Sequence, residues 1–219
     1  MSTTLVIGAS RGIGLEICRQ LKQRGEQIIA TCRTPSTELD GLGVTIIGDI
    51  DVANSKNIEQ LASVLKGTRL DLLIHNAGIL TSEPFDDLNY NRILKQFEVN
   101  TLGPLRVVHA LADNLSPGAK VGIVSSRVGS LDDNGSGGMY GYRISKAAVN
   151  MVGVNLAHDL RSRDIAVILL HPGLVSTDMT GGRGIDRSVA AGGIIERIDD
   201  LTMENTGTFW HAECYQLPW

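Results

Sequence analysis

The sequence predicts an α/β fold, a single doubly wound parallel β-sheet flanked by helices on both faces. Short apolar runs alternate with stretches of helical periodicity along the whole chain, and this alternation is typical of parallel strands joined by right-handed crossovers. A glycine-rich turn directly follows the first apolar run, as it does where such a sheet binds a phosphate. The length of 219 residues suits one domain with a large core.

The composition argues against several classes of protein. Hydrophobic residues make up 42% of the chain and charged residues 20%, and the signs behind the net charge of −4 are interspersed, so no surface for nucleic acid or an anionic membrane is indicated. No apolar run approaches the ~20 residues of a membrane span, and no basic stretch precedes the first apolar run as in a signal peptide. Cys18, Cys32 and Cys214 lack metal-ligand spacing. We therefore expect no metal site and reduced thiols in a cytoplasmic protein, with one reactive thiol as the alternative.

The first strand is predicted at residues 3–7, and helical periodicity follows through Ile13, Ile17 and Leu21. The turn between them has the spacing Gly-x-x-x-Gly-x-Gly and would present backbone N–H groups and a helix N-terminus to a phosphate. A turn without a ligand is the alternative. The predicted cofactor contacts in this turn are Gly8, Ser10, Arg11, Gly12, Ile13 and Gly14.

The second strand is predicted at residues 27–32 and is followed by Arg33. A site for unphosphorylated NAD usually has an acidic residue near this strand end, and none stands here before Glu38. Arg33 and Arg11 would instead clamp a 2′-phosphate with charge-assisted hydrogen bonds. The sequence therefore favours NADP(H), with NAD(H) as the second cofactor and two solvated surface arginines as the alternative interpretation.

Two further strand ends carry small or polar residues. Asp51 and Val52 follow the third predicted strand, where an adenine ring would rest. Asn76-Ala77-Gly78 follows the fourth, and its small side chains would let cofactor and backbone approach closely while Asn76 bonds neighbouring main chain. For His75 alone we favour a hydrogen-bonded structural role. The third to seventh strands are predicted at residues 44–48, 70–74, 120–125, 165–170 and 208–210, and the later helices at 58–65, 91–115, 140–161 and 189–198.

The helical pattern at 91–115 carries Pro104. Proline has no backbone N–H to donate and its ring clashes with the carbonyl four residues earlier, which is that of Asn100. We expect a kink at Asn100 that frees this carbonyl to hold a water. A polar, glycine-rich stretch at 127–138 then precedes the helix at 140–161.

Tyr142 and Lys146 stand four residues apart on the predicted helix, which places them on one face. A lysine cation within ~4 Å would offer up to ~4 kcal/mol to a phenolate. The pair would thus lower the pKa of Tyr142 and make it a general acid or base. The alternative is that the pair does nothing, since tyrosine and lysine fall four apart on many helices.

The sixth strand is followed by the turn 171–179, in which Pro172, Gly173, Val175 and Thr177 are predicted cofactor contacts. The glycine-rich loop 180–186 is expected to be mobile and to close over a substrate. The aromatic tail, residues 214–219, is expected to pack on a neighbouring element or subunit.

These motifs together resemble the classical short-chain dehydrogenase/reductase family, which has a Rossmann-type fold. Gly8-x-x-x-Gly12-x-Gly14, Asn76-Ala77-Gly78, Asn100, Ser126, Tyr142-x-x-x-Lys146 and Pro172-Gly173 occur in the order of that family over essentially the whole chain. Finer detail is similar to its C-factor-like and sniffer-like carbonyl reductase branch, in the stretches 126–130, 134–138, 142–148 and 171–179. The departures are Ile7, where the family often has threonine, and His75, where it often has asparagine.

The resemblance implies a role for each matching residue. Tyr142 would exchange a proton with the substrate oxygen, and Lys146 would hold the nicotinamide ribose and lower the pKa of Tyr142. Ser126 would donate a hydrogen bond to the developing oxyanion. The main-chain carbonyl of Asn100 would position a water, and Thr177 would reach the nicotinamide carboxamide. Ser126 is preferred to its neighbour Ser125 because it lies three residues before Gly129. Ser126 and Tyr142 are 16 positions apart, more than in many relatives, so the stretch between them would shape the substrate pocket.

The resulting prediction is one domain, residues 1–219, in which 1–90 mainly bind the cofactor and 91–219 carry catalysis and substrate binding. It would be an NADP(H)-dependent oxidoreductase that interconverts a carbonyl compound and an alcohol. The alternative is a regulatory or signalling protein that binds NADP(H) on the same fold, and an epimerase or dehydratase of nucleotide sugars would need a larger substrate domain. The predicted helix at 140–161 and the aromatic tail favour a homodimer or homotetramer.

Overall fold

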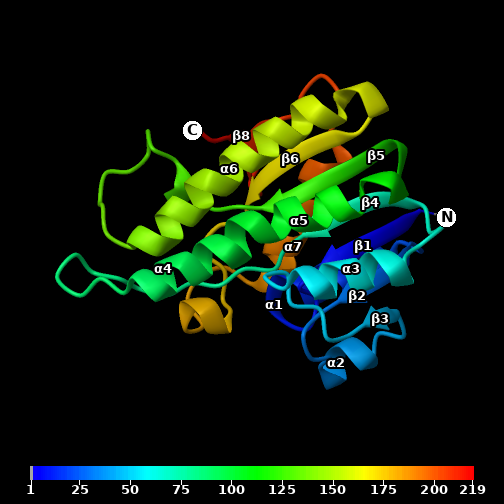
Figure 1. Ribbon diagram of the computed structural model, residues 1–219, viewed down its shortest axis with the longest axis horizontal. Helices are drawn as coiled ribbons and strands as arrows, with labels where there is room; N and C mark the ends of the chain where they lie inside the picture. The colour runs from blue at the N-terminus through cyan, green and yellow to red at the C-terminus, as the bar shows by residue number, and fades with distance from the viewer. Residues whose placement is uncertain (1) are drawn as a thin grey trace.

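A computed structural model describes residues 2–219, and its centre is one sheet of eight strands in the order β3-β2-β1-β4-β5-β6-β7-β8 (Figure 1). All neighbouring strands are parallel except β7 and β8. The strands are β1 Thr3–Ile7, β2 Gln27–Thr31, β3 Thr45–Ile47, β4 Leu70–His75, β5 Leu115–Val124, β6 Ala166–His171, β7 Thr208–His211 and β8 Tyr215–Gln216. The predicted fold class is confirmed.

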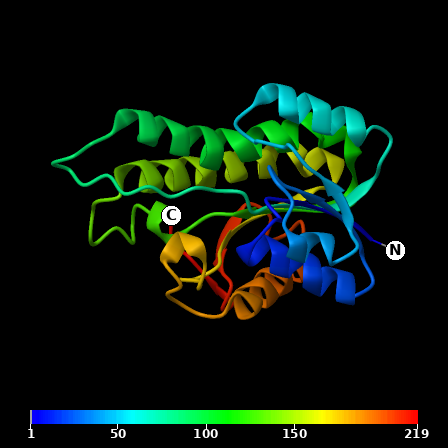
Figure 2. The same cartoon turned by 90° about the horizontal axis from the view of Figure 1, so that it is seen from below.

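Helices cover both faces of the sheet, so the molecule has three layers (Figure 2). The helices are α1 Gly12–Gln23, α2 Thr37–Asp40, α3 Ser55–Val64, α4 Tyr90–Phe97, α5 Gly103–Ala110, α6 Tyr140–Leu160 and α7 Arg187–Asp199. Buried residues of α3, α5 and α6 form the core on one face, and those of α1 and α7 form the core on the other. Successive residues of β4 serve the two cores in turn, Leu73 facing the first and Ile74 the second.

The chain reverses its direction of travel across the sheet between β1 and β4, because β1 pairs with β2 on one side and with β4 on the other. In a doubly wound sheet, ligands bind beyond the carboxyl ends of the strands at such a reversal. The segments that follow β1, β2, β4, β5 and β6 therefore reach one edge of the sheet, as the sequence predicts. None of the helices within residues 2–219 is both long and apolar enough to cross a membrane.

The helical stretch at 91–115 differs most from the prediction. Instead of one kinked helix, α4 leads into a π-helical turn at Glu98–Leu102, and α5 begins at Gly103. Pro104 lies at the start of α5, where the missing N–H is tolerated. The helical stretch ends at Asn114 and β5 begins at Leu115, five residues earlier than expected, because Leu115 pairs with Leu70 across a bulge. The short elements α2 and β8 were not predicted.

Candidate active site

The glycine turn after β1 is closed by main-chain contacts that exclude side chains. Gly8 has a φ of +84°, and a Cβ on it would lie 2.7 Å from the Cα of Ala77. A Cβ on Gly14 would lie 2.2 Å from the carbonyl oxygen of Gly8. Asn76 Nδ2 donates to that same oxygen at 2.9 Å, as predicted for a residue that bonds neighbouring main chain. The turn and the segment after β4 are thus held together by close main-chain packing and by the Asn76 side chain.

The start of α1 suits an anion. Within the described chain its N-cap, Arg11, makes no side-chain capping bond and its first turn has no acidic residue, so the positive end of the helix dipole is not neutralised locally. A Cβ on Gly12 would lie 3.4 Å from Thr177 Cγ2, which shows that the glycine turn faces the segment after β6. The main chain of Ser10 is held in place by Ser36, whose Oγ donates to the Ser10 carbonyl oxygen at 2.6 Å. These groups fit the pyrophosphate of a dinucleotide.

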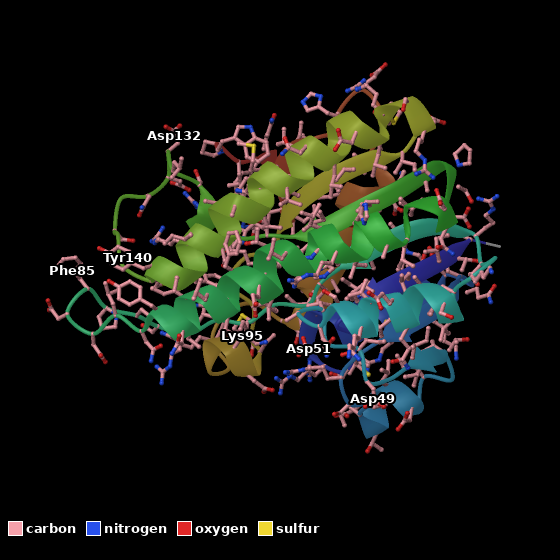
Figure 3. The ribbon with its side chains drawn as sticks, in the orientation of Figure 1. Asp49, Asp51, Phe85, Lys95, Asp132 and Tyr140 are labelled. Atoms are coloured by element: carbon pink, nitrogen blue, oxygen red, sulfur yellow. The ribbon has the colours of Figure 1, made fainter. Side chains whose placement is uncertain are left out.

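The two arginines predicted to clamp a 2′-phosphate have different surroundings. Arg11 pairs with Asp178 at 3.0 Å, and both side chains are mostly exposed. Arg33 makes no ion pair within residues 2–219. The main-chain N–H of Asp49 donates to the Arg33 carbonyl oxygen at 3.1 Å. An acidic residue from the end of β3 therefore stands beside the end of β2 (Figure 3), although none follows β2 itself before Glu38.

The segments after β3 and β4 lie under the middle of the site. Asp51 Oδ1 accepts a hydrogen bond from the N–H of Ala53 at 2.9 Å, so this carboxylate also shapes its own turn. Val52 is buried, and a Cβ on Gly103 would come within 2.9 Å of it. A Cβ on Gly78 would lie 3.3 Å from Asn100 Oδ1 and 3.8 Å from Lys146 Nζ. Gly78 therefore brings the chain next to two of the predicted catalytic residues.

Asn100 is buried in the π-helical turn and joins two segments through its side chain. Its Nδ2 donates to the Ile79 carbonyl at 2.8 Å and to Ser145 Oγ at 3.0 Å, and its Oδ1 accepts from the Ile79 N–H at 2.8 Å. The side chain thus ties the segment after β4 to α6. The role predicted for Asn100, a water held by its main-chain carbonyl, stays a prediction.

Ser126 and Ser125 point to different partners. The Ser126 hydroxyl lies close enough to Tyr142 to lower the pKa of its phenol, whereas Ser125 Oγ donates to Asn150 Oδ1 at 2.6 Å in the interior. The preference for Ser126 is consistent with this geometry, because only its hydroxyl shares a site with the phenol. Gly129 is needed nearby, since a Cβ there would lie 2.6 Å from the carbonyl carbon of Lys146.

Tyr142 and Lys146 lie on one face of α6, with Lys146 Nζ 5.7 Å from the centre of the Tyr142 ring. Lys146 Nζ donates to the Val124 carbonyl at 2.9 Å. Burial raises the pKa of Tyr142 to about 12, and the hydrogen bond with Ser126 only partly offsets that rise. Burial also lowers the pKa of Lys146 to about 8. The net pKa of Tyr142 is therefore raised and not lowered as predicted, because desolvation of the phenolate outweighs the effects that favour it.

The segment after β6 forms a closed loop beside the glycine turn. Gly173 has a φ of +86°, and Pro172 and Val175 are buried. The N–H of Thr177 donates to Thr180 Oγ1 in the next turn at 3.2 Å. The end of the 180–186 loop is fixed, since the Ile185 N–H donates to the Leu174 carbonyl at 2.8 Å. Closure of this loop over a substrate stays a prediction.

The polar stretch at 127–138 is held by Arg143, the residue after Tyr142. Its guanidinium donates to the carbonyls of Val128 and Gly137, both at 3.1 Å, and to Ser136 Oγ at 2.8 Å. The N–H of Leu131 donates to the Trp219 carbonyl, so the C-terminal tail packs on this stretch rather than extending freely. The predicted packing of the tail on a neighbouring element is confirmed within the chain.

His75 departs from its predicted role. Its ring is buried, but Nε2 has no hydrogen-bond partner among residues 2–219, and burial, with a smaller effect of Lys146, lowers its pKa to about 3. It is therefore neutral but not fully hydrogen-bonded.

The sequence analysis also missed Glu83, a buried carboxylate in the segment between β4 and α4. No local pattern signals it, because its partner Gln96 lies on a different element.

Other features of the chain lie apart from this edge. Within residues 2–219 no group of histidine, cysteine, aspartate and glutamate side chains is arranged to hold a metal ion. Cys18, Cys32 and Cys214 are free thiols, the first two buried. A hollow of about 370 Å³ lies between α7 and the turn after β7, and none of its lining residues is a predicted site residue.

Comparison with known proteins places the chain in a family. The model of the short chain dehydrogenase family matches residues 2–187. A 1-hydroxy-2-glutathionyl-2-methyl-3-butene dehydrogenase of Rhodococcus sp. (strain AD45) is 48% identical over 226 aligned residues, which cover 100% of both chains. The C-signal protein of Myxococcus xanthus is 40% identical over 68% of this chain and 93% of its own.

Solved structures agree with this assignment. The carbonyl reductase Sniffer of D. melanogaster superimposes with a TM-score of 0.92 at 29% identity and covers 100% of both chains. An NADPH-bound carbonyl reductase from chicken fatty liver gives a TM-score of 0.90 at 29% identity, over 100% of this chain and 99% of that one. The predicted resemblance, including its C-factor-like and sniffer-like branch, is confirmed. The chain belongs to the short-chain dehydrogenase family of oxidoreductases.

Proposed function

We propose that the protein is an NADP(H)-dependent oxidoreductase that interconverts an aldehyde or ketone and the corresponding alcohol. The observation that carries this proposal is the buried Tyr142 phenol with the Ser126 hydroxyl and the Lys146 ammonium beside it. A phenol and a hydroxyl that meet at the carboxyl edge of a doubly wound sheet can both reach the oxygen of one substrate. A protein that only binds a dinucleotide has no need of that pair.

The cofactor would lie across the carboxyl edge of the sheet. The glycine turn and the start of α1 would hold the pyrophosphate, Arg33 and Arg11 the 2′-phosphate, and Asp51 with Val52 the adenine. The nicotinamide half would be flanked by Asn76, Ala77 and Gly78, and its ribose would be held by Lys146. Its carboxamide would lie along the turn after β6, at Pro172, Gly173, Val175 and Thr177. When bound, NADP(H) supplies or receives the hydride. The NADPH-bound carbonyl reductase supports this choice, and Asp49 beside Arg33 keeps NAD(H) as the alternative.

The pKa values define the proton chemistry of the site. Because burial raises the pKa of Tyr142 to about 12, its phenol is protonated at neutral pH and can act as the general acid for a carbonyl oxygen. Ser126 would donate a hydrogen bond to the same oxygen as negative charge develops there. Lys146, with its pKa lowered to about 8, is still mainly cationic at pH 7 and stabilises the phenolate that remains. In the oxidative direction the same phenolate removes the hydroxyl proton.

The substrate proposed first is a small alcohol or carbonyl compound. The relative that is 48% identical over its whole length is named for an alcohol that carries a glutathionyl thioether beside the hydroxyl-bearing carbon. We therefore include thioether alcohols, with S-(2-hydroxyethyl)glutathione as the probe, in a screen of simple aldehydes, ketones and alcohols.

The first experiment is a fluorescence titration of the protein with NADPH and, separately, NADH. A preference for NADPH of about tenfold, or about 1.4 kcal/mol, would support the assignment of Arg11 and Arg33.

The second experiment replaces Tyr142 with phenylalanine, which should lower kcat about a thousandfold while cofactor affinity is retained. Tyr140→Phe, on the same helix but exposed, is the matched control. Full activity in Tyr142→Phe would refute the mechanism.

The competing proposal is a regulatory protein that binds NADP(H) and whose turnover is incidental. The similarity to C-signal is the observation that keeps it open, since one fold serves several functions. It would be favoured if the protein binds NADPH, turns over none of the screened compounds, and captures a specific protein whose binding changes with NADPH.

Self-association is proposed through the outer face of α4 and α6. Tyr90, Leu94, Ile144 and Met151 are large apolar side chains exposed on these two helices, and apolar patches of this kind often mark protein interfaces. A homodimer or homotetramer is expected, and light scattering of the purified protein would separate these from a monomer. A Met151→Lys variant should shift the equilibrium towards monomer.

A further inference from the structure

A buried carboxylate lies at the first turn of α6, although α6 does not supply it. Glu83 belongs to the segment between β4 and α4, and its side chain is only 1% exposed. Over the described chain, α6 has no acidic residue in its first turn, and its N-cap, Met139, makes no side-chain capping bond. A carboxylate from another segment therefore meets the positive end of a helix of 21 residues.

Glu83 is held by a closed set of hydrogen bonds. Gln96 Nε2, which is fully buried, donates to Glu83 Oε2 at 3.0 Å. The N–H of Thr81 donates to Gln96 Oε1 at 3.0 Å, and Thr81 Oγ1 donates to Glu83 Oε1. Both carboxylate oxygens and both polar ends of the amide therefore have a partner. Such a set is sensitive to the loss of one member, which leaves the others buried and unpaired.

The same two side chains press on the backbone directly before Tyr142. A Cβ on Gly141 would lie 2.2 Å from Gln96 Nε2 and 3.1 Å from Glu83 Oε2. Gly141 has no positive φ, so a glycine is needed here for space and not for its backbone conformation. Glu83 and Gln96 therefore contact the chain at the residue directly before Tyr142.

A second contact joins the same two segments at the surface. The rings of Phe85 and Tyr140 lie 6.2 Å apart (Figure 3), and Phe85 is 73% exposed. This exposed pair lies next to the buried set but shares none of its hydrogen bonds. It supplies a control at the same place in the fold.

We propose that Glu83 and Gln96, called here the Glu83–Gln96 brace, are positioning residues for Tyr142. The brace holds the first turn of α6 against the segment after β4, so that the phenol stays at Ser126 in the geometry that proton transfer requires. This inference rests on the proposed oxidoreductase function. A small displacement of a reacting group is enough to slow an enzyme strongly, whereas ground-state binding elsewhere is left unchanged.

The test compares Glu83→Ala with a variant in which the two partners are exchanged, Glu83→Gln with Gln96→Glu. Glu83→Ala leaves Gln96 Nε2 and Thr81 Oγ1 without their partner, so kcat should fall at least about tenfold while KM and the NADPH dissociation constant stay within about twofold. In the exchanged variant every hydrogen bond of the brace can reform, with donor and acceptor reversed only between residues 83 and 96, so kcat should lie within about threefold of the wild type. Phe85→Ala should leave kcat unchanged.

A readout independent of turnover is amide hydrogen exchange at residues 143–146. The Arg143 N–H, which donates to the Met139 carbonyl at 2.9 Å, reports the first closed turn of α6. Exchange there should be about tenfold faster in Glu83→Ala and normal in the exchanged variant. The rest of α6 should exchange as in the wild type.

The outcomes separate the brace from the proposed function. A wild-type protein that turns over no carbonyl compound or alcohol refutes the proposed function, and the exchange measurement then still decides on the brace. An active wild type with unchanged kcat and exchange in Glu83→Ala overturns the brace. Loss of protection along the whole of α6, with kcat and cofactor binding falling in step, also overturns it, because the residues would then act only on stability.

Discussion

The two halves of the candidate active site are built from different material. On the cofactor side the site consists of main chain, and side chains are excluded by contacts as short as the 2.2 Å that a Cβ on Gly14 would make with Gly8. On the catalytic side it consists of buried polar side chains, Asn100, Ser126, Tyr142 and Lys146, each at most 9% exposed. The cofactor half therefore requires that positions such as Gly14 carry no side chain. The chemistry of the catalytic half depends instead on what surrounds each buried polar group. Substitutions should act differently on the two.

The largest effect is expected on the main-chain side. Gly14→Ala places a methyl group against the Gly8 carbonyl and within 2.6 Å of Asn76 Nδ2, so the turn must open. We expect NADPH affinity to fall at least about a hundredfold, or about 2.7 kcal/mol, as measured by fluorescence titration. Gly192→Ala in α7, where the nearest atom lies at 3.5 Å, is the control and should bind normally. Normal binding in Gly14→Ala would show that the turn tolerates side chains after all.

The next effect concerns the side-chain half and is one of stability. Asn100→Ala removes three hydrogen bonds and leaves the Ile79 main chain and Ser145 without their partner. The free energy of unfolding should fall by about 2 kcal/mol, as measured by urea denaturation. Asn91→Ala, exposed on α4, should stay within about 0.5 kcal/mol of the wild type. Equal, small changes in both variants would mean that Asn100 does not tie the two segments together.

The pH dependence of turnover tests the environment of Tyr142. With its pKa raised to about 12, the phenolate needed for oxidation is scarce at neutral pH and grows about tenfold per pH unit, so kcat/KM for oxidation should rise from about pH 6 to about pH 9. The protonated phenol needed for reduction is saturated over that range, so Tyr142 gives reduction no such rise. The check is a pair of profiles with saturating cofactor. A plateau of the oxidative profile below about pH 8 would contradict a strongly raised pKa.

The smallest expected effect is on cofactor preference. Asp49 stands beside Arg33 with a φ of +58°, which asparagine also tolerates. Asp49→Asn removes a negative charge near the predicted 2′-phosphate site, so the ratio of NADPH to NADH affinity should rise about threefold at low salt and less at high salt. Titrations with both cofactors at two salt concentrations measure it. An unchanged ratio would place the phosphate away from this strand end.

The main-chain half was predictable from the sequence because its signals are local. The spacing Gly8-x-x-x-Gly12-x-Gly14 and the triplet Asn76-Ala77-Gly78 each report a turn that small residues alone can form. The positions of the side-chain residues were predictable from order and spacing, and the choice of Ser126 over Ser125 fits the geometry. Their environment was not predictable. The pKa of Tyr142 depends on how completely other elements cover it, and no pattern within α6 records that.

The long-range partners were also hidden in the sequence. Glu83, Gln96 and Gly141 come from three different segments, and each alone is an ordinary loop or helix residue. Asp49 was not predicted as a neighbour of Arg33 because it follows β3 in the sequence, whereas the sheet places the end of β3 beside the end of β2. The π-helical turn was expected only as a kink, since proline signals a disturbance in a helix but not its hydrogen-bond pattern.

The π-helical turn at Glu98–Leu102 also determines where the chain can tolerate insertions and deletions. Gln96 lies before this turn and Asn100 and Thr101 lie within it, yet all three face α6. Gln96 contacts Gly141, and Asn100 and Thr101 bond to Ser145. Deleting one residue from the turn would restore regular α-helical winding and rotate one of these groups by about 100° relative to the other. Gln96 or Asn100 would then point away from α6. Insertions and deletions should accumulate in the exposed loop around Phe85. They should be rare at the π-helical turn, because its extra residue keeps Gln96 and Asn100 on the same side of the helix.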